Sequence, residues 1–148
     1  MINNKTTVTF IVNPKSGTRS KDGIEDIIGQ AMNAVRFDCR VVRTEYAGHA
    51  SVIASQCVSE GLDICVAVGG DGTVNEVARS LVNSQTALGI VPCGSGNGLA
   101  RHLRLPMDMK EALAIINEAQ TDFFDYGTIN SQTFFSTCGI GFDTFVSA

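Results

Sequence analysis

The sequence predicts an α/β domain of three layers, in which helices cover both faces of a mostly parallel β-sheet. Short apolar or β-branched segments alternate along the chain with amphipathic segments of about 10–15 residues, the pattern of successive βαβ units. One short segment, residues 64–68, is apolar at every position, as expected for a strand that is buried on both faces of such a sheet. The 148 residues are enough for one domain, because a domain averages about 150 residues.

Each predicted strand is a short run of residues that ends at a polar residue, a glycine or a proline. The first run is followed by Asn13-Pro14, and Pro92 ends the fourth. A hairpin is also expected over residues 128–135, with its turn at Asn130-Ser131. The four strands of the sheet are expected at residues 8–12, 40–44, 64–68 and 88–91.

The predicted helices have apolar residues at helical spacing and capping residues at their starts. Three pairs of residues are expected to cap helix starts: Asp22 with Glu25, Thr73 with Glu76, and Asp108 with Glu111. Gly61 is expected to end the second helix. The expected helices span residues 24–35, 50–58, 73–81 and 109–116, with a short helical turn at 99–103.

The composition and the cysteines argue against several classes of protein. Eleven basic residues against 15 acidic ones give a net charge of −4, which disfavours a nucleic-acid-binding protein. No apolar run approaches the ~18 residues of a transmembrane helix, and the start lacks the apolar core of a signal peptide, so a cytoplasmic protein is expected. Without a C-x-x-C pair, the cysteines are expected to be buried, reduced thiols rather than zinc ligands or disulfides. They are Cys39, Cys57, Cys65, Cys93 and Cys138.

Three polar or glycine-rich loops follow the ends of predicted strands. They span residues 13–17, 69–73 and 94–98. In parallel α/β sheets, ligands bind beyond the carboxyl ends of the strands. The three loops therefore predict a binding site at one edge of the sheet.

The segment Gly69-Gly70-Asp71-Gly72-Thr73 joins a predicted buried strand to a helix start. Glycines let the backbone approach a ligand closely, and the free N–H groups of a helix start bind anions. A carboxylate repels a phosphate unless a cation or a proton lies between them, so Asp71 is predicted to bind through magnesium or to act as a general base in phosphoryl transfer. The alternative is that the glycines only shape a tight turn and that Thr73 and Glu76 only cap the helix, which leaves Asp71 unexplained.

The other two loops carry weaker indications when each is taken alone. Ser95 could donate to a phosphate oxygen, although a plain flexible turn is an equal alternative. Lys15, Arg19 and Lys21 could attract a polyphosphate, although a solvated charged run is the favoured alternative. The P-loop and dinucleotide-binding fingerprints are absent, and His49, expected at a helix start, is a poor candidate for a metal ligand.

Together and in this order, the three loops resemble those of the diacylglycerol kinase catalytic-domain family, which includes bacterial lipid kinases and the sphingosine and ceramide kinases. The resemblance runs from residues 11–17 to residues 139–143, and its most specific part is residues 68–77. It implies that residues 1–148 form a Rossmann-like nucleotide-binding domain. It also implies a β-rich second domain, with the active site for phosphorylation of a lipid hydroxyl by ATP and magnesium lying between the two.

The resemblance also implies which residues form the site. Asp71 is the implied catalytic residue, and the metal ligands are left open. Thr44 matches a threonine that precedes a glycine-containing turn in the family. The implied contacts with ATP are Asn13, Pro14, Lys15, Ser16, Gly17, Thr44, Gly70, Asp71, Gly72, Thr73, Val74, Asn75, Glu76 and Ser95.

The lipid acceptor is less well defined by the resemblance. Many diacylglycerol kinases have Gly-Thr-Gly-Asn-Asp where this chain has Gly94-Ser95-Gly96-Asn97-Gly98. Ser95 keeps the hydroxyl, but Gly98 lacks the acid, a version closer to the sphingosine kinases. The implied acceptor is therefore diacylglycerol or a sphingoid base, with the sphingoid base favoured by this loop.

The resemblance implies ATP and a lipid as partners, with peripheral membrane contact by a full-length protein, and leaves a homo-oligomer open. Two other functions share the glycine-rich Asp71 loop: an NAD-kinase-like or sugar-phosphate kinase, and a non-catalytic, nucleotide-binding regulatory domain. Phosphoryl transfer needs donor, metal and acceptor held together away from water. Without a second domain, residues 1–148 are therefore expected to bind nucleotide but not to phosphorylate a lipid.

Overall fold

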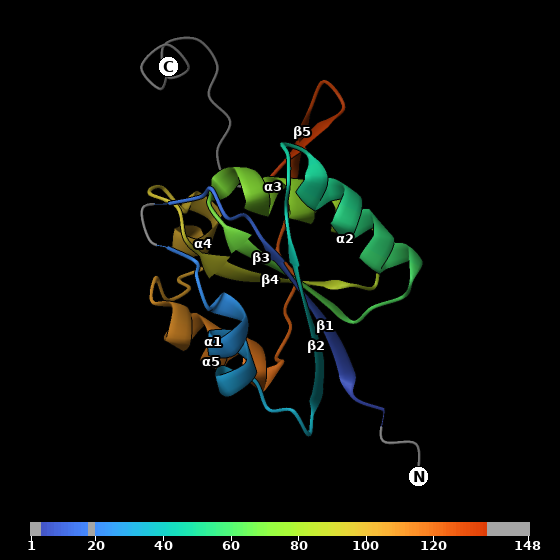
Figure 1. Cartoon of the computed structure of the whole chain (residues 1–148). Helices are drawn as coiled ribbons and strands as arrows, with labels where there is room; N and C mark the ends of the chain where they lie inside the picture. Colours follow the sequence, from blue (N-terminus) through green and yellow to red (C-terminus); the bar gives the residue numbers. More distant parts are fainter. Residues whose placement is uncertain (1–3, 18–19, 136–148) are drawn as a thin grey trace.

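A four-stranded parallel sheet forms the centre of the computed structural model, which describes residues 4–17 and 20–135 (Figure 1). Its strand order is β2-β1-β3-β4, and each neighbouring pair is parallel. The strands are β1 (Thr6–Val12), β2 (Phe37–Arg43), β3 (Ile64–Gly69) and β4 (Ala87–Pro92), followed by an antiparallel hairpin of β5 (Gly127–Ile129) and β6 (Gln132–Phe134). The helices are α1 (Ile24–Ala31), α2 (His49–Ser59), α3 (Asp71–Leu81), α4 (Gly98–His102) and α5 (Met109–Glu118).

Two apolar clusters, one on each face of the sheet, confirm the predicted three-layer α/β fold. Phe10 and Val66 belong to the cluster that α1 and α5 cover, whereas Ile11 and Ala67 belong to the cluster of α2, α3 and α4. Figure 1 shows α2 and α3 on one side of the sheet and α1 and α5 on the other. Successive strand residues enter opposite clusters because side chains alternate across a strand, so the central strands are apolar at nearly every position.

The register brings the carboxyl ends of the strands to one level. Val12 of β1 lies opposite Val68 of β3, which lies opposite Val91 of β4. The chain passes from β1 to β2 on one side of β1 and returns to β3 on the other. The gap between β1 and β3 is therefore the topological switch point, where ligands of such sheets bind.

The first helix is shorter than predicted, and its predicted cap is wrong. α1 ends at Ala31, and Val35, expected on its apolar face, is 72% exposed. The side chain of Asn33 accepts a hydrogen bond from the Val35 amide (2.9 Å), which forms a turn, and β2 begins at Phe37 rather than at residue 40. The residue before the helix is Gly23, without a side-chain cap.

The predicted capping residues of α1 bind other partners. Asp22 accepts a hydrogen bond from the Ser20 hydroxyl at 2.7 Å. Glu25 forms an ion pair with Arg43 of β2, with 2.8 Å between Oε1 and Nε. This hydrogen bond lowers the pKa of the Glu25 carboxyl.

The third helix begins two residues earlier than predicted, at Asp71, so the capping box of Thr73 and Glu76 is also wrong. By contrast, Asp108 accepts hydrogen bonds from the Lys110 and Glu111 amides at 3.0 and 3.1 Å, which confirms the cap of α5. The hairpin turn at Asn130-Ser131 is confirmed as well, with positive φ at both residues.

The cysteines follow the prediction only in part. Cys57 and Cys65 are buried in the cluster under α2 and α3, and burial raises the pKa of the Cys65 thiol. Cys39 is exposed on the edge strand β2, against expectation, and Cys93 is half-buried. Cys138 lies outside the described residues.

Candidate nucleotide site

The three predicted loops meet at the carboxyl edge of the sheet. A Cβ added at Gly17 would lie 1.8 Å from the carbonyl oxygen of Cys93, which places the first loop directly against the third. Similarly, a Cβ at Gly94 would lie 2.7 Å from the Cα of Gly70, which places the third loop against the second. Only glycine permits these close backbone approaches, so the glycines bring the loops together.

The first loop forms a compact turn around Asn13. The Asn13 side chain accepts from the Lys15 amide (2.9 Å), and the Ser16 hydroxyl donates to the Asn13 carbonyl (3.1 Å). The side-chain amide of Asn13 also donates to the Thr73 hydroxyl at 3.1 Å. Asn13 therefore joins the loop after β1 to the first turn of α3, across the switch point.

The basic residues of this segment do not form a single solvated run. Lys15 is exposed, and Arg19 lies outside the described residues. Lys21 is only 6% exposed, and its ammonium group donates to the carbonyl and to the hydroxyl of Ser16 (2.8 Å to Oγ). The favoured expectation of a solvated run is therefore wrong for Lys21.

Asp71 is exposed at the first residue of α3 and lies between the second and third loops. Its Oδ1 accepts from the Gly98 amide at 2.6 Å. Its Oδ2 lies beside Gly96, where a Cβ would come within 2.6 Å of it. Within residues 4–17 and 20–135, Oδ2 has no hydrogen-bond donor, so one carboxylate oxygen is fixed and the other faces the space between the loops.

The loop after β2 contacts α3 through Glu76. The Glu76 carboxylate accepts from the Gly48 amide at 3.1 Å, and the Thr44 amide donates to the Val12 carbonyl at 2.8 Å. His49 begins α2 as predicted, and its Nδ1 accepts from the Glu45 amide at 3.1 Å. Glu76 therefore acts in the described structure as a tie between two loops rather than as a helix cap.

A cleft of about 500 Å³ opens between the first, second and third loops. It contains several of the predicted site residues: Ser16, Gly17, Gly70, Asp71 and Ser95. The other nine residues that were predicted to contact ATP do not line the cleft. Among them, the side chain of Val74 is buried in the core. Asn13, Thr73 and Glu76 instead hold the surrounding loops in place, as described above.

Ten lining residues are outside the set of implied ATP contacts. Half of them lie in or just before the third loop: Pro92, Cys93, Gly94, Gly96 and Asn97. The other five are Ser20, Lys21, Arg101, Met107 and Met109. Arg101 donates from Nε to the Gly96 carbonyl at 2.8 Å and so braces the third loop. Met107 and Met109 are ordinary apolar residues close to the start of α5, and no local pattern in the sequence distinguishes them from core residues. Only the fold brings them beside Asp71.

Positive φ does not explain the glycines at positions 70 and 72 of the Asp71 loop. Gly70 has a φ of −89°, and Gly72 is not among the glycines with positive φ. A Cβ at Gly72 would meet nothing within 4 Å, which leaves its backbone open to a ligand. Close approach to Gly94 therefore explains Gly70, whereas no contact among the described residues requires a glycine at position 72.

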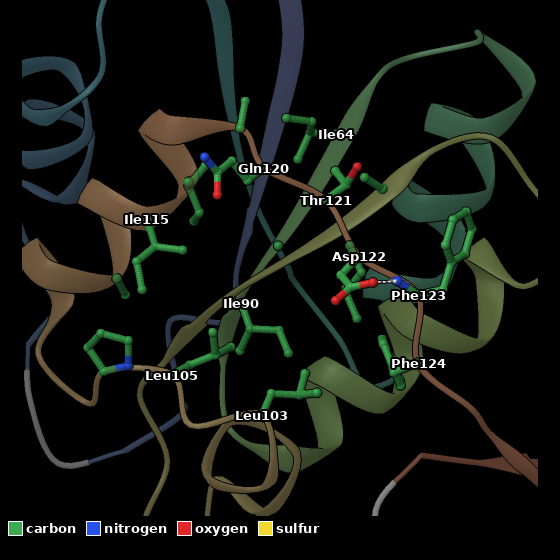
Figure 2. A pocket seen from close by; sticks show the side chains of 17 residues that line it. Ile64, Ile90, Leu103, Leu105, Ile115, Gln120, Thr121, Asp122, Phe123 and Phe124 are labelled. Carbon is green, nitrogen blue, oxygen red and sulfur yellow. Dashed lines mark hydrogen bonds between the residues drawn. The ribbon is translucent and has the colours of Figure 1, made fainter.

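A second hollow, of about 320 Å³, lies beside β4 and has a different character (Figure 2). Its lining is mostly apolar and includes Ile90, Leu103 and Ile115. The one carboxylate in it, Asp122, accepts a hydrogen bond from the Phe123 amide at 2.8 Å. Because it offers no cation and no cluster of open amides, the cleft between the glycine loops is the better site for an anion.

Asp71, the one carboxylate among the described residues that line the cleft, suits a magnesium ion only in combination with a ligand. In the part of the chain that the structure describes, no group of three or more His, Cys, Asp or Glu side chains could hold a metal. Magnesium in phosphoryl-transfer sites is commonly held by one or two carboxylates together with phosphate oxygens and water. The exposed Oδ2 of Asp71 fits such an arrangement.

The described helices include none that is long and apolar enough to cross a membrane.

Comparisons with known proteins agree on one family. Residues 7–129 match the diacylglycerol kinase catalytic domain. The chain is 34% identical over 141 residues to a diacylglycerol kinase of Staphylococcus saprophyticus and 30% identical over 140 residues to one of Staphylococcus carnosus. Each alignment covers 93% of this chain but 46% of the relative, so the chain spans a little under half the length of these relatives.

Solved structures show the same fold. The crystal structure of a diacylglycerol kinase from Bacillus anthracis superposes with a TM-score of 0.74 at 28% identity, covering 87% of this chain and 48% of that one. A putative diacylglycerol kinase from the same organism gives a TM-score of 0.75 at 29% identity, covering 87% and 45%. With most of its length matched by the family, this chain belongs to the diacylglycerol kinase catalytic-domain family.

Proposed function

We propose that this chain is the nucleotide-binding part of a lipid kinase that transfers the γ-phosphoryl group of ATP to a lipid hydroxyl. The observation that carries the proposal is the meeting of three glycine loops around an exposed carboxylate, Asp71, at the switch point of a parallel sheet. Family membership supports the reaction class.

The phosphates of ATP would lie in the cleft between the loops. Gly17, Gly70 and Gly96 line the cleft, and their lack of side chains lets the three loops close around it, which would bring backbone amides near the phosphates. The 11-residue helix α3 starts at the same place and adds the positive end of its dipole. The exposed Ser95, which lines the cleft, and the exposed Lys15, whose neighbour Ser16 lines it, would donate to the same phosphates.

Asp71 would act at the transferred phosphoryl group. The Gly98 amide fixes Oδ1, which leaves Oδ2 to hold magnesium or to orient the acceptor hydroxyl. When bound there, magnesium would offset the charge that gathers on the phosphate oxygens during transfer. The residues of the chain itself supply position, since phosphoryl transfer depends chiefly on alignment and electrostatic stabilisation.

The acceptor is proposed to be diacylglycerol rather than a sphingoid base. The relatives that align over nearly all of this chain are named diacylglycerol kinases, which outweighs the single difference at Gly98 that favours a sphingoid base. The part of these relatives that this chain does not cover would correspond to a second domain, which would form the other side of the active site. We further propose a cytoplasmic protein that meets the membrane surface to reach its lipid.

A panel of acceptors tests the proposal. The 148-residue chain is titrated with Mg–ATP and Mg–ADP by calorimetry. It is then assayed with labelled ATP and diacylglycerol, sphingosine, NAD or a sugar phosphate, beside a longer form that contains the second domain. We expect nucleotide binding by both forms and labelled diacylglycerol only with the longer form. Transfer of the label to NAD or to the sugar phosphate would instead indicate an NAD-kinase-like or sugar-phosphate kinase. Nucleotide binding by the longer form without phosphorylation of any acceptor would indicate a regulatory domain.

A further inference from the structure

Lys21 lies at the floor of the cleft and has an incomplete set of partners. Its side chain is 94% removed from solvent, yet its ammonium group has only two acceptors among the described residues, both on Ser16. An ammonium group has three donors. One donor of a buried cation is therefore left for a group that the described chain does not supply.

Lys21 has no carboxylate partner among the described residues, and the neighbouring Cys93 thiol is the group that favours its charged form. The two ion pairs among the described residues join Arg40 to Glu60 and Arg43 to Glu25, and neither includes Lys21. The nearby Arg43, which donates to the Lys21 carbonyl at 3.1 Å, adds a second positive charge. Burial of a charge is unfavourable unless an opposite charge accompanies it, so this arrangement calls for an anion. Burial lowers the pKa of the Lys21 ammonium, as expected for a cation without a carboxylate partner.

A chain of hydrogen bonds connects Lys21 to the rest of the cleft. The ammonium donates to the Ser16 hydroxyl, which donates to the Asn13 carbonyl at 3.1 Å. The side chain of Asn13 in turn donates to Thr73 at the start of α3. The segment before α1 is thereby linked to α3 through Lys21 and the first loop.

We propose that Lys21 is a phosphate-binding residue, which holds the Ser16 loop with two of its donors and offers its third donor and its charge to a polyphosphate in the cleft. This inference rests on the proposed function, because the polyphosphate is that of the bound nucleotide. It adds a residue that sequence reasoning treated as part of a solvated run.

The test compares three variants of the 148-residue chain. Lys21→Met removes the charge and keeps the length, Lys21→Arg keeps the charge, and Lys5→Met removes an exposed charge just before β1, at the opposite end of the sheet. The probes are Mg–ATP and inorganic tripolyphosphate, whose binding is measured by calorimetry at low and high salt. Thermal unfolding shows how much of each variant is folded.

We expect Lys21→Met to weaken both probes by about tenfold or more and by similar factors, because the loss is at the phosphates. The salt dependence of binding should fall at the same time, which a purely structural role would not cause. Lys21→Arg should stay within about threefold of the parent and Lys5→Met within about twofold. Parent affinity in folded Lys21→Met overturns the proposal, as does a parent chain that binds no tripolyphosphate.

If Lys21→Met does not fold, Lys21→Gln carries the test, because it removes the charge and keeps a hydrogen-bond donor for Ser16. A tenfold loss of tripolyphosphate affinity then supports the proposal, and parent affinity overturns it. The lipid assay separates this inference from the proposed function. Binding that depends on Lys21, without lipid phosphorylation by the longer form, would reject the kinase and keep the phosphate site.

Discussion

Gly17→Ala tests whether contact between the first and third loops creates the nucleotide site. Gly17 has a φ of +70°, and an added Cβ would lie 1.8 Å from the Cys93 carbonyl oxygen, where ordinary contact begins at about 3.4 Å. The two loops must therefore separate by well over one ångström. The left-handed backbone adds a further cost of about 1–2 kcal/mol for any residue with a Cβ.

Gly61→Ala is a matched control because it carries the backbone cost without the clash. Gly61 has a φ of +68° after α2, and an added Cβ would meet nothing within 4 Å. Both variants should lose about 1–2 kcal/mol of unfolding free energy from the backbone, or a few degrees in Tm. Only Gly17→Ala should also lose at least about tenfold in Mg–ATP affinity, since a displacement of about 1 Å in a site is costly.

Urea unfolding gives the stability of each variant, and calorimetry at a temperature where both are folded gives the affinity. The stability loss of Gly17→Ala should exceed that of Gly61→Ala, since the loops must also move. Equal Mg–ATP affinity in the two variants would refute the reasoning, because the loops would then bind nucleotide without touching.

Three further predictions follow from the same contacts. Asp71→Asn should lower lipid kinase turnover of the longer form by ~10²-fold or more, because it removes a metal-linked or acid–base group. The Tm should change little, because Asp71 is exposed, and unchanged turnover would remove Asp71 from the mechanism. Gly72→Val should fold, because its Cβ meets open space, but should weaken Mg–ATP binding; parent affinity would show that no phosphate approaches this backbone. Glu25→Gln should remove stability that is present above the ordinary pKa of 4.5 and is lost as the pH falls below it, because Arg43 lowers the pKa of Glu25 in the folded state. Urea unfolding at pH 7 and pH 3 should therefore show a difference between parent and Glu25→Gln that shrinks at the lower pH, and a constant difference would contradict the role of the ion pair.

The sequence by itself determined the fold class and the edge of the sheet at which the three glycine-containing loops meet. The apolar run of β3 and the alternation of strands with amphipathic helices are properties of neighbouring residues, so they are visible without a structure. The cap at Asp108 was predicted correctly for the same reason, since its hydrogen bonds reach only two and three residues ahead. The loops after β1, β3 and β4 must share an edge in any parallel sheet.

The tertiary structure alone decided which partners the polar side chains choose. The sequence predicts helix caps at Glu25 and Glu76, but these residues bind Arg43 and Gly48, which lie 18 and 28 residues away. Such partners exist only after the sheet brings β1, β2 and β3 together, and a distant ion pair or amide then competes with a local cap.

The same reason separates Lys15 from Lys21. The two lysines belong to one basic segment in the sequence, yet the fold leaves Lys15 in solvent and buries Lys21 against Ser16, in the cleft that also contains Asp71 and Met107. Burial depends on what the rest of the chain places around a side chain. The sequence could therefore predict three loops at one edge of the sheet, and only the packing of those loops against one another decided which charges and which backbone groups face the cleft.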